Sequence, residues 1–205
     1  MVTLLIAISP PKKISENIIS LRKYLVQKTG LNPFKDTKAH ITLLVNTFPN
    51  FKDVDKELKN LVKSYKPFMA EIEKIDGFGY DPIWKATTVI YKVKGNKEIS
   101  DLQKEIFEKI APLRDDEQVK WLLQQNNKFS KEAMKNIKKY GYPYGPKGWS
   151  FHTSIAVVPK EDYKKLQEYI KKFDLNIKWK VDHIHVLKYY GDKGFKYYKK
   201  YKLGN

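Results

Sequence analysis

Alternating strand and helix patterns predict an α+β protein. Along the 205 residues, short apolar runs typical of strands alternate with segments whose apolar residues recur every three or four positions, as they do on one face of a helix. Hydrophobic residues make up 41% of the chain, enough for a buried core, and charged residues make up 31%. The order of these segments predicts sheets that are covered by helices on one side.

The first half of the chain is expected to hold most of the strands. The run Val2–Ser9 is apolar and short, which indicates a buried strand. Ser15 is a candidate N-cap for a helix over Glu16–Lys28, and Gly30 is placed to end that helix. The same patterns predict a second helix at Asp53–Tyr65. They also predict three further strands, at Ala39–Phe48, Phe68–Ile75 and Ala86–Val93.

The second half repeats this rhythm around a polar interruption. Ser100 and Gln103 match a capping box, so we expect a helix from there to Pro112. The polar segment 113–148 does not fit the rhythm and is helical in pattern, and we interpret it as a helical insertion or lid. The remaining expected elements are strands at Phe151–Val158, Ile177–Tyr189 and the closing GFKYYKKYKL, and a helix at Glu161–Phe173.

The basic charge of the chain points to an anionic partner. Lysine and arginine total 40 against 23 acidic residues, a net charge of +17, and only Arg22 and Arg114 are arginines. A surplus of this size attracts phosphates, so a nucleic acid or a nucleotide is the first candidate. The scarcity of arginine argues against bidentate readout of bases. Lysines that are simply solvated are the alternative.

Composition also bears on location. The chain has no cysteine, which excludes disulfides and thiolate metal sites. The N-terminal VTLLIAIS is too short to span a bilayer and lacks the basic start and the cleavage pattern of a signal peptide. We therefore expect a cytoplasmic protein that does not contact a membrane.

Two short motifs repeat one arrangement of a histidine and a hydroxyl. HITL starts at His40 and HTSI at His152, and each places the histidine two residues before a hydroxyl, that of Thr42 or of Ser154. Because alternate residues of a strand share a face, each ring and its hydroxyl should point the same way. The hydroxyl can hydrogen-bond a phosphate oxygen while the imidazole transfers a proton. Two such pairs, in a chain with four histidines, indicate phosphate chemistry.

With these motifs the chain resembles the two-histidine phosphoesterase superfamily, which includes the 2′-5′ RNA ligase-like proteins and the 2′,3′-cyclic nucleotide phosphodiesterases. The resemblance covers the chain apart from 113–148. It implies a single bilobal domain over 1–205, in which two mainly antiparallel sheets face a central cleft with helices outside. One histidine strand would lie on each wall of the cleft.

The resemblance and the motifs together predict a metal-independent phosphodiesterase without a cofactor. In-line displacement at phosphorus needs a base and an acid, roles suited to His40 and His152 in an order that depends on substrate orientation. Thr42 and Ser154 would offset charge on the phosphoryl oxygens. The expected reaction opens a 2′,3′-cyclic phosphate or cleaves a 2′-5′ linkage of RNA or an oligonucleotide. Degradation of a cyclic di- or trinucleotide signal and a non-catalytic RNA-binding module are the alternatives.

Aromatic residues near the second motif are candidates for substrate binding. Tyr142, Tyr144 and Trp149 stand in a loop that also carries lysines, and Tyr80 and Trp84 stand in an earlier turn. Rings beside lysines suit nucleotide bases next to a phosphate. An ordinary packed loop, rich in glycine and proline, is the alternative.

The sequence VDHIHVL holds the two remaining histidines, His183 and His185. If Ile184 and Val186 face the helices, both rings face the cleft, and we predict that His185 contacts phosphate or base. Packing or surface histidines are the alternative. Asp182 beside them also suits a metal site, but no further ligand can be assigned, and we expect no metal.

Overall fold

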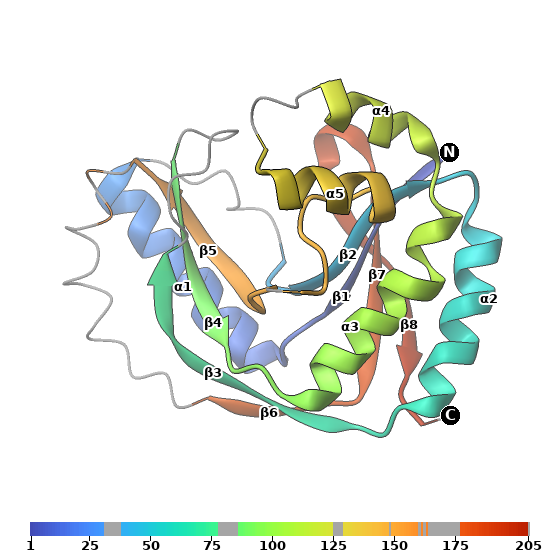
Figure 1. Cartoon of the computed structure of the whole chain (residues 1–205). Coiled ribbons are helices and arrows are strands. Elements are labelled where there is room, and N and C mark those ends of the chain that lie inside the picture. The colour runs from blue at the N-terminus through green and yellow to red at the C-terminus, as the bar shows by residue number, and fades with distance from the viewer. Residues whose placement is uncertain are drawn as a thin grey trace.

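Eight strands form two antiparallel sheets in the computed structural model (Figure 1), which describes residues 1–30, 38–77, 86–124, 129–147, 149–159, 161, 163 and 177–204. The α+β class is thereby confirmed. The first sheet has the order β2-β1-β7-β8, with strands at Ile41–Phe48, Val2–Ile8, His183–Tyr189 and Phe195–Lys202. The second has the order β5-β4-β3-β6, with strands at His152–Val158, Thr87–Val93, Phe68–Gly77 and Lys178–Val181.

The two faces of the first sheet differ in character. Ile6 and its neighbours of the same face are fully buried in the main core, which also includes α3 (Lys97–Lys109). On the opposite face, Thr42 pairs with Ala7, and Ala7 pairs with His185. Directly paired residues project to the same side of a sheet. Thr42 of the first motif and His185 of VDHIHVL therefore share this second face.

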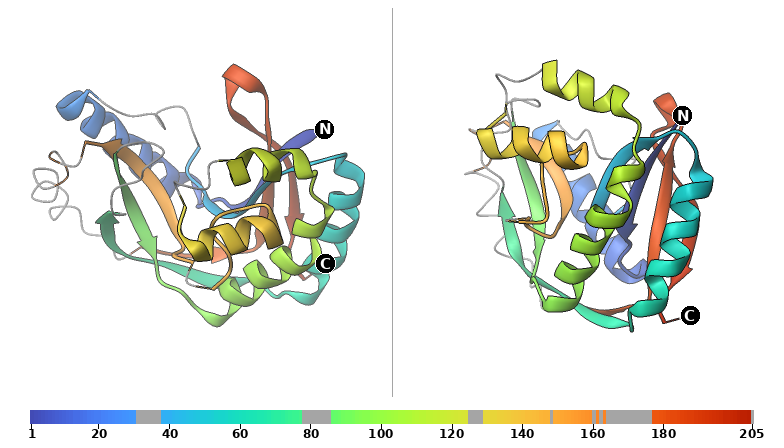
Figure 2. Two further views of the ribbon diagram at one scale, coloured as in Figure 1. Left: turned by 45° about the horizontal axis from the view of Figure 1, so that its top comes forward. Right: turned by 45° about the vertical axis from the view of Figure 1, so that its right-hand side comes forward.

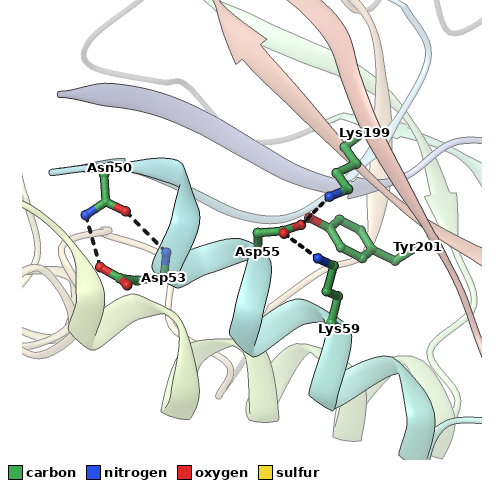
Figure 3. A network of polar contacts seen from close by, with 6 residues as sticks. All are labelled: Asn50, Asp53, Asp55, Lys59, Lys199 and Tyr201. Atoms are coloured by element: carbon green, nitrogen blue, oxygen red, sulfur yellow. Dashed lines mark hydrogen bonds and ion pairs between the residues drawn. The ribbon is translucent and has the colours of Figure 1, made fainter.

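A carboxylate of α2 (Phe51–Leu61, continued by a short 3-10 turn) fastens that helix to the last strand (Figure 3). Asp55 accepts hydrogen bonds from Lys199 Nζ at 2.6 Å and from the Tyr201 hydroxyl at 2.5 Å, and Lys59 Nζ lies 2.8 Å away. Partial burial acts to raise the pKa of Asp55, but these three donors lower it to about 2. The contact keeps α2 on the face opposite to the motif residues.

The first helix, α1, begins earlier than the sequence predicts. It spans Lys12–Thr29 and follows a proline, and Gly30 ends it in the left-handed conformation. Ser15 lies inside the first turn, where its hydroxyl donates to the carbonyl of Pro10 at 3.1 Å. The expected N-cap at Ser15 was therefore wrong, because the helix can start without a side-chain cap directly after the Pro-Pro pair.

Helix α3 also starts ahead of its expected cap. The side chain of Asn96 accepts a hydrogen bond from the backbone amide of Ile99 at 2.9 Å, so Asn96 is the N-cap. Asn50 caps α2 in the same way. The capping box assigned to Ser100 was wrong, because an asparagine four residues earlier already satisfies a free amide of the first turn.

The expected strand Ile177–Tyr189 is divided between the two sheets. It breaks at Asp182, and β6 pairs with β3 while β7 pairs with β1 and β8. Trp179 of β6 and Ile184 of β7 are both buried in the main core although they lie on opposite parities of the chain. A single straight strand cannot bury both parities on one face, so the prediction of one strand was wrong.

The polar insertion consists of two helices, α4 (Asp116–Gln124) and α5 (Lys131–Tyr140). Asn46 of β2 donates to the carbonyl of Tyr140 at 2.9 Å and so ties the end of α5 to the first sheet. The two helices share a small apolar cluster of their own, formed by Val119, Leu122 and Ile137. The described part of 113–148 contains the expected helices, and its interpretation as an insertion or a lid stays a prediction. Among the described helices, none is long and apolar enough to cross a bilayer.

Candidate active site

One edge strand of each sheet carries or follows a motif histidine. β2 ends the first sheet and β5 ends the second, and residues of the two strands contact each other. Figures 1 and 2 show β5 and β2 on either side of the same region, with α1 running beside β5. His40 immediately precedes β2 and His152 opens β5. The charge of His152 contributes to lowering the pKa of His40, so the two rings are near enough to interact electrostatically.

Both imidazole rings are held by the same backbone contact. Nδ1 of His40 lies 2.7 Å from the carbonyl oxygen of Lys38, and Nδ1 of His152 lies 2.7 Å from that of Ser150. A carbonyl can only accept, so Nδ1 carries the hydrogen in each ring. In the neutral rings Nε2 is then the nitrogen that takes up a proton, and it has the same assignment in both halves of the site.

Burial holds both rings in the neutral form. It lowers the pKa of His40 to about 4, opposed by the hydrogen bond to Lys38 and assisted by the charges of Arg22 and His152. Burial also lowers the pKa of His152, against the effect of its own backbone hydrogen bond. A phosphate anion between the rings would favour their protonated forms and so raise both pKa values.

Arg22 of α1 is a site residue that the sequence analysis did not identify. Its side chain is 2% exposed, and Nη2 donates to the backbone carbonyl of Ser154 at 2.5 Å. Burial lowers the pKa of Arg22 to about 10, which leaves the guanidinium charged at neutral pH. The charge lies near enough to His40 to lower its pKa. The sequence feature that could have pointed to Arg22 is the rarity of arginine, because Arg22 is one of only two arginines among the 40 lysines and arginines.

In the second motif the hydroxyl of Ser154 shares a face with His152, as strand periodicity predicts. On β5, His152 pairs with Lys92 and Ser154 pairs with Ile90 of β4. Lys92 Nζ lies 3.2 Å from a carboxylate oxygen of Glu73. Both hydroxyl-bearing side chains of the motifs are half-buried, a depth at which they remain accessible to a bound group.

Three of the predicted aromatic residues gather next to His152. The ring centroids of Tyr142 and Tyr144 are 5.6 Å apart, and the ring of Tyr144 lies 5.6 Å from that of Trp149. The centroid of Trp149 in turn lies 5.7 Å from that of His152. Tyr144 is 49% exposed, whereas burial raises the pKa of Tyr142. Their contact with substrate stays a prediction.

Two further candidates for substrate binding, Tyr80 and Trp84, lie outside the described residues, as does most of the expected helix Glu161–Phe173. His185 does face the same side of the first sheet as Thr42. In the described ranges, no three histidine, aspartate or glutamate side chains are grouped as they would be around a metal ion.

Comparison with known proteins decides the family. The family model described as the 2′-5′ RNA ligase superfamily matches residues 10–193. The chain belongs to this superfamily. The resemblance to two-histidine phosphoesterases inferred from HITL and HTSI is thereby confirmed, and membership supports an activity of the phosphodiesterase type. A search of curated proteins finds no match.

Solved structures share the fold at low sequence identity. The chain is similar to TT0787 of Thermus thermophilus, with a TM-score of 0.62 and 15% identity over 99% of this chain and 98% of that one. It is also similar to E. coli LigT complexed with 3′-AMP, with a TM-score of 0.58 and 13% identity over 100% and 99% of the two chains. The two-lobed expectation agrees with a LigT-like fold built on two four-stranded sheets.

Proposed function

We propose that this protein is a metal-independent phosphodiesterase that opens 2′,3′-cyclic phosphates or cleaves 2′-5′ linkages of RNA or oligonucleotides. The observation that carries the proposal is the matched pair of Nδ1 contacts, each 2.7 Å long, that give His40, just before edge strand β2, and His152, at the start of edge strand β5, the same tautomer. Two rings of fixed tautomer on opposite sides of one phosphorus atom supply both proton transfers of an in-line displacement.

The reaction balances with water as the only co-substrate. One imidazole takes a proton from water as its oxygen bonds to phosphorus, and the other gives a proton to the ribose oxygen as its bond to phosphorus breaks. The product is a phosphate monoester with a free ribose hydroxyl. Thr42 and Ser154 donate hydrogen bonds to the phosphoryl oxygens, where negative charge increases in the transition state.

The charge beside His40 supports one assignment of the two roles. Arg22 adds positive charge on the side of His40 and favours its neutral form, which is the form that a base needs. We therefore assign His40 as the base and His152 as the acid, protonated once the substrate phosphate is bound.

A nucleotide substrate is favoured by charge and by the comparison. The net charge of +17 attracts phosphates. E. coli LigT has been captured with 3′-AMP and with ATP, and 3′-AMP is one of the two monoesters that opening of adenosine 2′,3′-cyclic phosphate yields. The aromatic residues beside His152 offer a base a stacking surface.

The test is a substrate panel assayed in EDTA: oligoribonucleotides with cyclic phosphate ends, 2′-5′ and 3′-5′ dinucleotides, and cyclic dinucleotides. We expect turnover of the cyclic phosphate ends or the 2′-5′ linkage, unaffected by the chelator. Turnover of cyclic dinucleotides alone would favour the degradation of a nucleotide signal instead. RNA binding without turnover of any substrate, or activity that EDTA abolishes, would overturn the proposal.

A further inference from the structure

A cavity of about 630 Å³ lies beside the first motif. It is bounded by the start of α1, by the two residues before His40, by the β6–β7 junction and by β8. This volume is in the range of small-molecule binding sites. The side chains that decide its chemistry are Lys12, Lys38, Lys180, His183, His185 and Tyr197.

One wall of this cavity is made of aromatic rings. The rings of His183 and His185 are nearly parallel, at 16° with centroids 6.1 Å apart, and the ring of Tyr197 lies 4.8 Å from that of His185. Burial is the main cause that lowers the pKa of His185 to about 4, so this imidazole is neutral at pH 7. Its Nδ1 is buried and has no hydrogen-bond partner in the described ranges.

The rim of the cavity is basic. Lys38 Nζ lies 5.2 Å from the centre of the Tyr197 ring, so a positive charge stands at the edge of the aromatic wall. The carboxylates of the lining already have partners: Asp182 accepts from Nδ1 of His183 at 2.7 Å, and Glu16 lies 3.7 Å from the ammonium nitrogen of Lys12. Flat rings with lysines beside them suit a nucleobase that carries a phosphate.

The cavity adjoins the reaction site. Lys38 lines it, and the carbonyl of the same residue accepts the Nδ1 hydrogen of His40. Pairing through Ala7 places His185 and Thr42 on one face of the sheet, two strands apart, which is about 10 Å. A nucleoside joined to a phosphate at His40 spans such a distance.

We infer that this cavity is a subsite for a second nucleoside, the neighbour of the nucleotide whose phosphate reacts. The inference rests on the proposed function and sharpens its substrate: a chain of at least two nucleotides ending in a cyclic phosphate, rather than a lone cyclic mononucleotide. Tyr197 is the ring on which the second base stacks.

The test compares kcat/KM for adenosine 2′,3′-cyclic phosphate with kcat/KM for the adenylyl dinucleotide that ends in the same cyclic phosphate. The wild type is expected to prefer the dinucleotide, and Tyr197→Ala is expected to lower that preference about tenfold. Tyr198→Ala is the matched control, because this tyrosine is the next residue of β8, is 45% exposed against 41%, and packs on Phe51 instead. The control should keep the wild-type preference.

A binding experiment separates this inference from the proposed function. Diadenosine 3′-5′ monophosphate is titrated into the protein while the ring signals of His183 and His185 are followed by NMR. Shifts that Tyr197→Ala abolishes support the subsite even if no substrate is turned over. Turnover with equal preference for both substrates and no effect of Tyr197→Ala overturns the subsite and leaves the proposed function standing. Absence of both turnover and shifts overturns the subsite as well.

Discussion

The two motif histidines have the same backbone contact and different surroundings. Beside His40 the site is electropositive, since buried Arg22 lies near and Lys38 supplies both the accepting carbonyl and a cation at the adjoining cavity. Beside His152 it is aromatic, since the ring of Trp149 lies 5.7 Å away and leads to Tyr144. The backbone contact is duplicated, while the side chains around the two rings differ.

This difference teaches that a repeated motif does not imply repeated roles. Equal tautomers give both rings the capacity to transfer a proton through Nε2, whereas the charge of Arg22 further lowers the pKa of His40. A symmetric pair in symmetric surroundings would have no preferred direction.

Replacement of either motif histidine should abolish most of the activity. His40→Gln and His152→Gln are each expected to lower kcat by about 10²–10⁴-fold, because each removes one proton transfer. In the pH–rate profile, His40→Gln should remove the dependence on the acidic side, and His152→Gln that on the alkaline side. Loss of the opposite limbs would reverse the assigned roles, and thermal unfolding checks that both variants fold.

Truncation of the aromatic surface should weaken binding. Trp149→Ala is expected to raise KM for a cyclic nucleotide about tenfold, as is typical of the loss of one base-stacking ring. Trp149→Phe keeps a ring at the same place and serves as the matched variant, with a smaller increase expected. Equal KM values for the alanine variant and the wild type would assign these residues to packing alone.

Removal of the charge of Arg22 should move the acidic limb of the pH–rate profile. Arg22→Gln removes a cause that lowers the pKa of His40, so this pKa is expected to rise and the limb to shift to higher pH. Arg22→Lys keeps the charge and should shift the limb less. A profile unchanged in Arg22→Gln, measured on protein shown to be folded, would contradict the role of the arginine in setting the asymmetry.

The smallest expected effect is on stability. The folded pKa of His40 is about 4, while the unfolded value is about 6.5, so between these pH values the unfolded chain binds a proton that the folded chain does not. The free energy of unfolding should therefore fall as pH drops from about 6.5 to about 4. Urea denaturation of His40→Gln should show a shallower pH dependence than the wild type. Identical slopes in the two proteins would contradict the lowered pKa of His40.

Local patterns predicted the parts of the site that depend on local geometry. The face shared by a histidine and the hydroxyl two residues later follows from strand periodicity alone, as on β5 for His152 and Ser154. The aromatic residues that lie next to His152 could also be predicted, because they come shortly before this strand in the sequence. The class of fold followed from the order of strand and helix patterns.

The features that were missed depend on contacts between distant segments. Arg22 donates to a carbonyl 132 positions away, and no local pattern reports such a partner. At Asp182 the chain passes from one sheet to the other. The pattern of apolar residues along this segment does not show which sheet each part joins. The second aromatic wall, around Tyr197, likewise forms only when β7 and β8 pair.

The position of β1 between β2 and β7 has a consequence for biosynthesis. The strand that follows His40 is synthesised early, but the sheet that supports it gains its other half only from residues 183–202. A nascent chain that still lacks these residues exposes an open hydrogen-bonding edge on β1. The first sheet is therefore expected to be completed only after residues 183–202 have been synthesised.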